Sequence, residues 1–332
     1  MMERFEYVSP GTVDEALKYL ASEKATAKAG GIDLLDLMKE GLSSPSRIVN
    51  LLGIASLRTI TGDAAAGIRI GAGVTLAEVG DHPEIAQRYA ALSMAARGAA
   101  TPQIRNAATI AGNLCQRPRC WYFRSADFPC LRKGGDTCYA QEGENRYHAV
   151  FDNGLCAIVH PSAIAIALMA LRARVTITNG KTTREVPLDG FFVSPEEDVR
   201  RETTLKQGEL ILDVIVPPAG NSSASSYLKL KEKQSFDWPL AEAAVVFHLD
   251  GTVCRDASVV LGAAAPVPMR VQAVEAFLRG KEITPATARA AARLPFDKAT
   301  PLRDNGYKVQ LLKTALRRTI LAAAGRDPMK EE

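Results

Sequence analysis

Residues 25–38 read ATAKAGGIDLLDLM, and this stretch decides the fold of the first part of the chain. Residues 25–29 are predicted to form a short strand, and residues 32–38 have the apolar spacing of a helix. Gly30 and Gly31 join them, and such a junction lets main-chain N–H groups at the positive end of a helix approach an anion, typically a phosphate. The alternative is that the two glycines only make a tight turn. Neither GxGxxG nor GxxxxGK[ST] occurs, so the Rossmann and P-loop fingerprints are absent.

The pattern on either side of this stretch predicts mixed helices and strands. A helix is expected after Thr12, which forms a capping-box pair with Glu15, and a second one after the pair Thr75 and Glu78. That second helical sequence runs to residue 100. Strands are expected at residues 5–8 and 47–50, a hairpin at 57–73, and further strands around 174–187 and 209–217.

Residues 217–226, PPAGNSSASS, are the best candidate for a linker. Beyond them, residues 227–233 alternate as an edge or half-buried strand, an Asp250-Gly251 turn predicts a hairpin, and helices continue to a stop at Gly325. The C-terminal third is therefore expected to be a small α+β unit. Cys254 lies in one of its alternating strands and is expected to be a buried structural thiol.

Composition excludes several classes of protein. The chain has 332 residues, 47% of them hydrophobic, and a net charge of +4, which gives no reason to expect nucleic acid or a membrane surface as partner. The first residues contain no apolar signal-peptide core, and no run of about 18 apolar residues occurs. The expected location is the cytoplasm, whose reducing conditions disfavour disulfides.

Five of the six cysteines lie between residues 115 and 156. Cys120, Cys130, Cys138 and Cys156 are spaced C-x9-C-x7-C-x17-C, with Cys115 before them. The segment is rich in Gly, Arg, Asp and Asn, so packing alone is not expected to hold it, and a metal bound by cysteines is the obvious candidate.

The spacing leaves three possibilities open. A 4Fe-4S cluster accepts wide spacings because the loop wraps around it. A structural zinc ion usually takes its ligands as C-x2–4-C pairs, and none occurs here; disulfides or inert thiols are the third possibility. The arginines among these cysteines would offset the charge of a cluster, and the aromatic residues 121–123 would screen it from water. His148 and His160 flank the segment as structural or supporting residues.

Four motifs carry a resemblance to a known family: KAGGIDLL (residues 28–35), IRNAATIAGNL (104–114), SFDWPLAEAAV (235–245) and LGAAAPVPMR (261–270). Together and in this order they resemble the FAD-binding medium subunit of the xanthine dehydrogenase and molybdenum hydroxylase family. The resemblance implies an α+β fold: a two-subdomain FAD-binding domain of the vanillyl-alcohol-oxidase (PCMH) type at residues 1–220, divided at 55/56, and a flavoprotein C-terminal domain at 226–328. It places an iron–sulfur insert at about 115–157.

The resemblance also assigns cofactor-binding residues. The first motif would wrap the FAD pyrophosphate, the second would lie along the FAD, Lys229 and Asp237 would lie near the flavin ring, and Leu210 would pack on the cofactor. Ala163 departs from the pattern because the family usually has Asp at this position. The full assigned set is Lys28, Ala29, Gly30, Gly31, Ile32, Asp33, Leu34, Leu35, Thr109, Gly112, Asn113, Leu210, Lys229 and Asp237.

Two subgroups of the family carry a cysteine insert with a 4Fe-4S cluster: the flavin subunit of periplasmic-type aldehyde dehydrogenases and the β subunit of 4-hydroxybenzoyl-CoA reductase. The segment RPRCWYFRS and the cysteines after it are more similar to the first. This similarity selects Cys120, Cys130, Cys138 and Cys156 as ligands and omits Cys115.

The implied function is electron transfer. Electrons from a molybdopterin-binding large subunit would pass through a 2Fe-2S small subunit to FAD and then to a small-molecule acceptor, in a heterotrimer or a dimer of heterotrimers. No catalytic acid or base is expected in this chain, and export with a signal-bearing partner would place the complex in the periplasm. The alternatives are a 4-hydroxybenzoyl-CoA reductase-like subunit, a standalone flavin oxidoreductase and a zinc-stabilised binding module.

Overall fold

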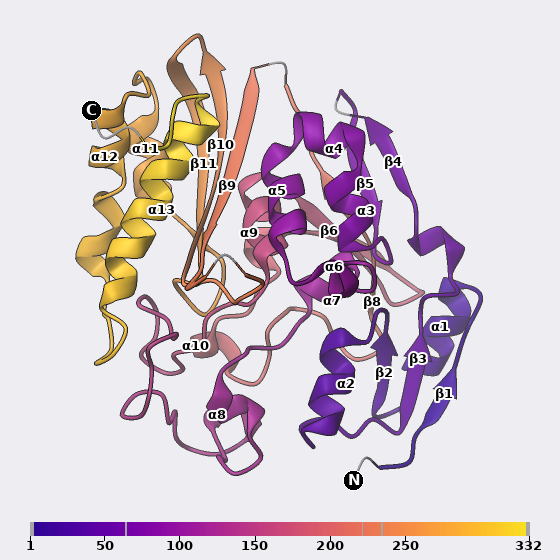
Figure 1. The fold of residues 1–332 in the computed structure, drawn as a ribbon. Coiled ribbons are helices and arrows are strands. Elements are labelled where there is room, and N and C mark those ends of the chain that lie inside the picture. The colour runs from indigo at the N-terminus through magenta and orange to yellow at the C-terminus, as the bar shows by residue number, and fades with distance from the viewer. Residues whose placement is uncertain (1–2, 64, 221, 234, 330–332) are drawn as a thin grey trace.

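A computed structural model describes residues 3–63, 65–220, 222–233 and 235–329. Three sheets divide the chain into an N-terminal, a middle and a C-terminal part (Figure 1). In the N-terminal part, β1 (Glu6–Val8), β3 (Arg47–Asn50) and β2 (Ala25–Lys28) pair in this order, and all are parallel. Parallel strands need crossover connections, which the helices α1 (Val13–Leu20) and α2 (Ile32–Lys39) provide.

The middle part has an antiparallel sheet of five strands. Their order is β4 (Ile60–Asp63), β5 (Gly67–Gly71), β8 (Leu210–Val216), β6 (Arg174–Thr178) and β7 (Thr183–Pro187). The helices of this part are α3 (Leu76–Asp81), α4 (Pro83–Arg88), α5 (Ala90–Gly98), α6 (Pro102–Arg105), α7 (Ile110–Leu114) and α9 (Ala163–Ala170). Short 3-10 turns lie at Ala55–Leu57, Leu131–Lys133, Leu188–Gly190 and Leu294–Lys298.

The helical sequence that follows Thr75 starts as predicted and then breaks. Thr75 and Glu78 form the expected capping box at the start of α3. The stretch to residue 100 is divided into α3, α4 and α5. The first break comes at His82, whose backbone is extended because the residue before a proline is disfavoured in the helical region.

Helix α9 lies between the middle and C-terminal parts. Every residue of AIAIALMA is buried, and the helix contacts α5, β10 (Ala241–Asp250) and β11 (Val253–Gly262). A helix that is apolar on all sides is stable only when it is covered on all sides. The main core therefore continues from the middle part onto one face of the C-terminal sheet.

The C-terminal sheet is antiparallel, in the order β12 (Met269–Arg270), β11, β10, β9 (Ser223–Leu230). Its other face is covered by α11 (Gln272–Leu278), α12 (Pro285–Ala291) and α13 (Tyr307–Ala323), which form a second core (Figure 1). Strand β9 is an edge strand, as predicted, but it begins inside the predicted linker because residues from 223 onward pair with β10. The α+β architecture that the sequence predicts is confirmed.

The cysteine-rich segment forms a long excursion beneath the C-terminal part and beside α2 of the N-terminal part (Figure 1). Its regular structure within the described residues is the short helix α8 (Trp121–Arg124) and the 3-10 turn at 131–133. The loop containing α10 (Pro195–Asp198) lies beside it, because Arg132 and Arg117 both bind Glu202.

Candidate functional site

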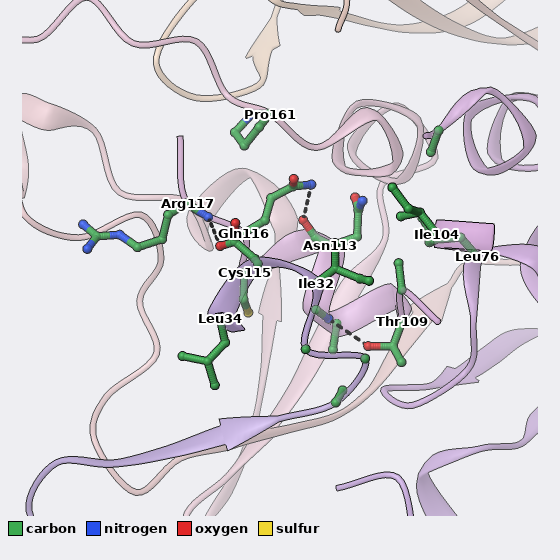
Figure 2. Close-up of a pocket in the computed structure, with 18 of the residues that line it drawn as sticks. Ile32, Leu34, Leu76, Ile104, Thr109, Asn113, Cys115, Gln116, Arg117 and Pro161 are labelled. Carbon is green, nitrogen blue, oxygen red and sulfur yellow. Dashed lines mark hydrogen bonds between the residues drawn. The ribbon is translucent and has the colours of Figure 1, made fainter. Parts of the chain in front are cut away.

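A cavity of about 610 Å³ lies where the three parts of the chain meet. Figure 2 shows its wall around Ile32, Asn113, Gln116 and Pro161. Thirteen of the fourteen residues assigned from the resemblance line it: Lys28, Ala29, Gly30, Gly31, Ile32, Asp33, Leu34, Thr109, Gly112, Asn113, Leu210, Lys229 and Asp237. Leu35 does not, and its side chain is 38% exposed. Successive helical side chains are about 100° apart, so residues 33, 34 and 37 of α2 face the cavity and residue 35 does not.

The Gly30-Gly31 junction is held against a second wall of the cavity. A Cβ atom on Gly30 would lie 2.0 Å from the carbonyl oxygen of Ala107, so only glycine fits there. Gly31 has φ +78° and precedes α2 without a capping side chain. The first N–H groups of α2 thus begin at the cavity, where the helix dipole favours negative charge. The structure shows the tight turn and places the helix start at the cavity, and anion binding at this junction stays a prediction.

Helix α7 carries the second motif. The hydroxyl of Thr109 accepts the Gly112 N–H at 3.2 Å and begins the helix. The hydroxyl of Ser162, which begins α9, donates to the side-chain oxygen of Asn113 at 2.6 Å. This bond fixes Asn113 on the cavity wall from a segment 49 residues further along the chain. Ala163 follows Ser162 and presents an apolar surface to the same cavity.

Strand β9 and the loop after it also line the cavity. Lys229 reaches the carbonyl oxygen of Gly98 at 3.3 Å, and burial lowers the pKa of its ammonium group. The loop also carries Asp237 and two exposed aromatic side chains, Phe236 and Trp238, which are 60% and 54% exposed. The guanidinium of Arg119 lies 5.0 Å from the centre of the Trp238 ring. This side of the cavity therefore combines charged groups with an apolar rim.

Glu242 is a cavity residue that the sequence analysis missed. It lies in β10, is fully buried, and accepts a hydrogen bond from the Tyr227 hydroxyl. The sequence could have pointed to Glu242, because it stands within the apolar run AEAAVVF. A charged residue in a buried strand is uncommon unless it has a partner. The partner itself is 15 residues away on the adjacent strand and could not be identified from the sequence.

Four cysteines line a second, small cavity: Cys120, Cys130, Cys138 and Cys156. Tyr122, Phe123, Tyr139 and His148 share its wall. All six cysteines are free thiols, so the disulfide possibility is not realised. Within the described residues, no three His, Cys, Asp or Glu side chains converge closely enough to hold a single metal ion. The four thiols line one space, and those of Cys138 and Cys156 are hydrogen-bonded to each other.

The ionisation of these thiols differs. The thiol of Cys156 donates to Cys138, and this bond lowers the pKa of Cys138 to about 6 and raises that of Cys156. Burial raises the pKa of Cys120 to about 11, and that of Cys115, on the wall of the large cavity, to about 12. A cation in the small cavity would therefore have to displace protons from buried thiols.

The arginines of the insert pair with carboxylates of other segments, and one of them, Arg132, also lines the cysteine cavity. Arg119 and Arg124 both bind the carboxylate of Asp33 on α2, and the Arg117 N–H donates to it at 2.8 Å. Asp33 therefore ties the insert to the first motif, and burial raises its pKa against the lowering effect of these partners.

Glu202 makes the second connection to the insert. It binds Arg117 at 3.0 Å and Arg132 at 2.5 Å, and the side chain of Arg132 is only 2% exposed. The Nε and Nη1 atoms of Arg132 are buried without hydrogen-bond partners among the described residues. Arg132 lines the cysteine cavity, so its positive charge remains next to the four thiols.

The two flanking histidines are buried, as their supporting role implies. The Nε2 atom of His148 lies 3.2 Å from the sulfur of Cys120, and burial lowers the pKa of His148 to about 4. His160 accepts the Ser162 N–H and packs on Phe192, and burial lowers its pKa to about 3. Both rings are therefore neutral at pH 7.

The two cavities share a stretch of chain. Cys115, Gln116, Arg117 and Arg119 line the large cavity, and Cys120 lines the small one. Consecutive Cα atoms are about 3.8 Å apart, so the two walls meet between residues 119 and 120. Leu37 adds a second connection, because it lines the large cavity and packs with Phe123 and Cys130.

Two family models match the chain. The FAD-binding domain in molybdopterin dehydrogenase matches residues 3–219, and the CO dehydrogenase flavoprotein C-terminal domain matches residues 225–323. Fold and cavity thus define a flavin-binding oxidoreductase component. More specifically, the chain belongs to the family of FAD-binding medium subunits of the molybdenum hydroxylases.

Named relatives agree with this assignment over nearly the whole length. The aldehyde oxidoreductase FAD-binding subunit PaoB of Escherichia coli is 35% identical, covering 97% of this chain and 99% of the relative. The carbon monoxide dehydrogenase medium chain of Hydrogenophaga pseudoflava is 28% identical over 97% and 98%. A solved structure of carbon monoxide dehydrogenase from the same organism superposes with a TM-score of 0.78 at 26% identity, covering 98% and 99%. Quinoline 2-oxidoreductase from Pseudomonas putida shares the fold, with a TM-score of 0.76 at 23% identity and coverage of 98% of each chain.

No helix within the described ranges is both long and apolar enough to cross a lipid bilayer.

Proposed function

We propose that this chain conducts electrons within a molybdenum hydroxylase complex, with FAD in the large cavity and a 4Fe-4S cluster in the cysteine cavity. The observation that carries the proposal is the shared wall, in which Arg119 lines one cavity and Cys120 the other. Adjacent redox centres would exchange electrons directly, whereas two unrelated sites need no common wall.

We also propose the division into an FAD-binding domain at 1–220 and a C-terminal domain at 226–328.

The fit of the large cavity to FAD rests on two groups of lining residues. Backbone N–H groups follow Gly30-Gly31 at the start of α2, which suits a pyrophosphate. Lys229, Asp237 and Glu242 supply polar groups beside apolar walls, which suits a flavin ring. We assign the thirteen lining residues named above as FAD contacts and leave Leu35 out.

The fit of the small cavity to a cluster rests on its thiols. Four free cysteine side chains surround one space, and aromatic rings cover it. Structural zinc sites usually take their ligands as C-x2–4-C pairs, and these four cysteines contain none. A cube of iron and sulfide takes one thiolate at each iron, which suits thiols placed around a space. Buried Arg132 supports the charge that such a cluster brings.

FAD would couple two-electron transfer to one-electron transfer, and this chain would position the cofactors and set the charges around them. Asp33 and Glu202 hold the insert against the FAD loop through Arg117, Arg119 and Arg124. The aromatic residues around the cysteines keep water away. Oxidation of the organic substrate would take place on a molybdopterin-binding large subunit, with a 2Fe-2S small subunit between. The likeness to PaoB favours an aldehyde as that substrate.

The test is anaerobic reconstitution of the full chain with FAD, iron and sulfide. We expect flavin absorbance, four irons and four acid-labile sulfides per chain, and no aldehyde oxidation without the partners. Cys120→Ser should lose most of the iron and keep FAD. Cys254→Ser is the matched control, because Cys254 is a buried free thiol of the C-terminal sheet that lines neither cavity, and it should keep both. A chain that binds zinc but neither flavin nor sulfide would contradict the proposal.

A further inference from the structure

Glu242 occupies a special place in the C-terminal sheet. It lies directly opposite Lys229 of β9 and Gly262 of β11, and opposed residues share a face of the sheet. This face packs on α9 and the middle part, while Ala243 and Val245 face the C-terminal helices. Glu242 has no exposed surface and lines the large cavity. Its carboxyl group is therefore reachable only from within that cavity.

The packing around Glu242 leaves room for its carboxyl group. A Cβ atom on Gly262 would lie 1.8 Å from the side chain of Ile166 and 2.7 Å from Oε2 of Glu242, so any larger residue would displace one of them. The Tyr227 hydroxyl donates to Oε1. Oε2 is buried without a hydrogen-bond partner among the described residues. A buried oxygen without a partner is costly unless it carries a proton or meets a ligand.

The charges that face Glu242 come from two elements. Tyr227 and Lys229 lie on β9, Lys308 lies on α13, and α9 contributes only apolar side chains. Burial raises the pKa of Glu242, and Lys229, Tyr227 and Lys308 oppose this shift. Burial also lowers the pKa of Lys229. The charge of Lys231 lowers it further, whereas the carboxylates of Glu242 and Asp237 raise it. The site can hold a proton at Glu242 and still stabilise the carboxylate once the proton leaves.

We propose that Glu242 exchanges a proton with the flavin in this cavity when the flavin is reduced and reoxidised, while Lys229 and Tyr227 stabilise the carboxylate between the two events. The inference rests on the proposed function. Reduction of FAD to FADH2 takes two electrons from iron–sulfur centres of the complex and two protons. The O–H bond of Glu242 breaks to supply one proton as an N–H bond forms on the ring, and water supplies the other. Reoxidation passes the two electrons to the terminal acceptor, returns one proton to Glu242 and releases the other to water.

The test uses the full chain loaded with FAD and reduced anaerobically with dithionite. Infrared difference spectra should show the C=O band of a protonated carboxyl group disappear on reduction. The rate of reduction should fall as pH rises through the pKa of Glu242, because the proton donor is then lost. In Glu242→Gln the band should be absent, and the rate should be about 10²-fold lower and independent of pH. Glu242→Asp keeps a carboxyl group and should recover part of the rate and a shifted band.

Glu275→Gln is the matched control. Glu275 is also a buried carboxylate of the C-terminal part, but it is paired with Arg270 at 2.9 Å and lies outside the cavity. This variant should keep the band and the pH dependence. Unchanged spectra and rates in Glu242→Gln with FAD bound would overturn the inference and leave the proposed function intact. A wild-type chain that takes up no FAD would overturn the proposed function instead. Should Glu242→Gln fail to fold, an unshifted band in Glu242→Asp overturns the inference.

Discussion

Substitution of Gly30 by alanine should damage the large cavity without changing any charge. The new Cβ would lie 2.0 Å from the Ala107 carbonyl oxygen and 2.7 Å from its carbonyl carbon. Real Cβ contacts need 3.0 Å or more, so the two backbones must separate by about 1 Å. Both are main chain and cannot rotate away as a side chain would. Overpacking of this kind costs about 1–3 kcal/mol, and we expect the upper half of that range.

The assay compares urea unfolding of the FAD-free chain with FAD titration by quenching of flavin fluorescence. If about 2–3 kcal/mol of the strain falls on the FAD-bound state, FAD affinity should drop by roughly 30- to 140-fold, because about 1.4 kcal/mol is a factor of ten. Gly154→Ala is the control: an added Cβ there meets nothing within 4 Å, so both values should stay near wild type. Wild-type affinity and stability in Gly30→Ala would refute the close approach of the two backbones.

Three further perturbations test the buried charges. Burial lowers the pKa of Lys308 to about 7, so above that pH the unfolded chain binds more protons than the folded chain. The free energy of unfolding should therefore rise by about 2 kcal/mol between about pH 7 and pH 9. Lys308→Met should abolish this rise, as measured by urea unfolding at each pH. The lowered pKa of His160, about 3, predicts a loss of about 3 kcal/mol as pH falls from about 6.5 to 4, which His160→Gln should remove in acid unfolding. Glu202→Gln should leave Arg132 buried without its carboxylate and cost about 3 kcal/mol, seen as faster proteolysis of the insert, whereas exposed Glu196→Gln should not change the cleavage rate.

The elements of the fold were predictable where the signal is local. The Gly30-Gly31 junction, the capping box at Thr75 and the hairpin at Asp250-Gly251 each depend on residues within a few positions of one another. Their hydrogen bonds close within one turn, so the residue types alone specify them. The same reasoning failed at residues 223–226, which look like linker but gain a strand ladder from β10.

The sequence by itself determined the α+β fold, the glycine junction and the four cysteines as a set. Only the tertiary structure decided what each charge does: Arg117 meets Glu202 across 85 positions, Arg119 meets Asp33 across 86, and Glu242 meets Tyr227 on the next strand. Periodicity and turn chemistry act along the chain, whereas ion pairs and shared cavity walls depend on which distant segments the packed sheets bring together. Electrostatic partners therefore follow from the fold, and the sequence alone does not reveal them.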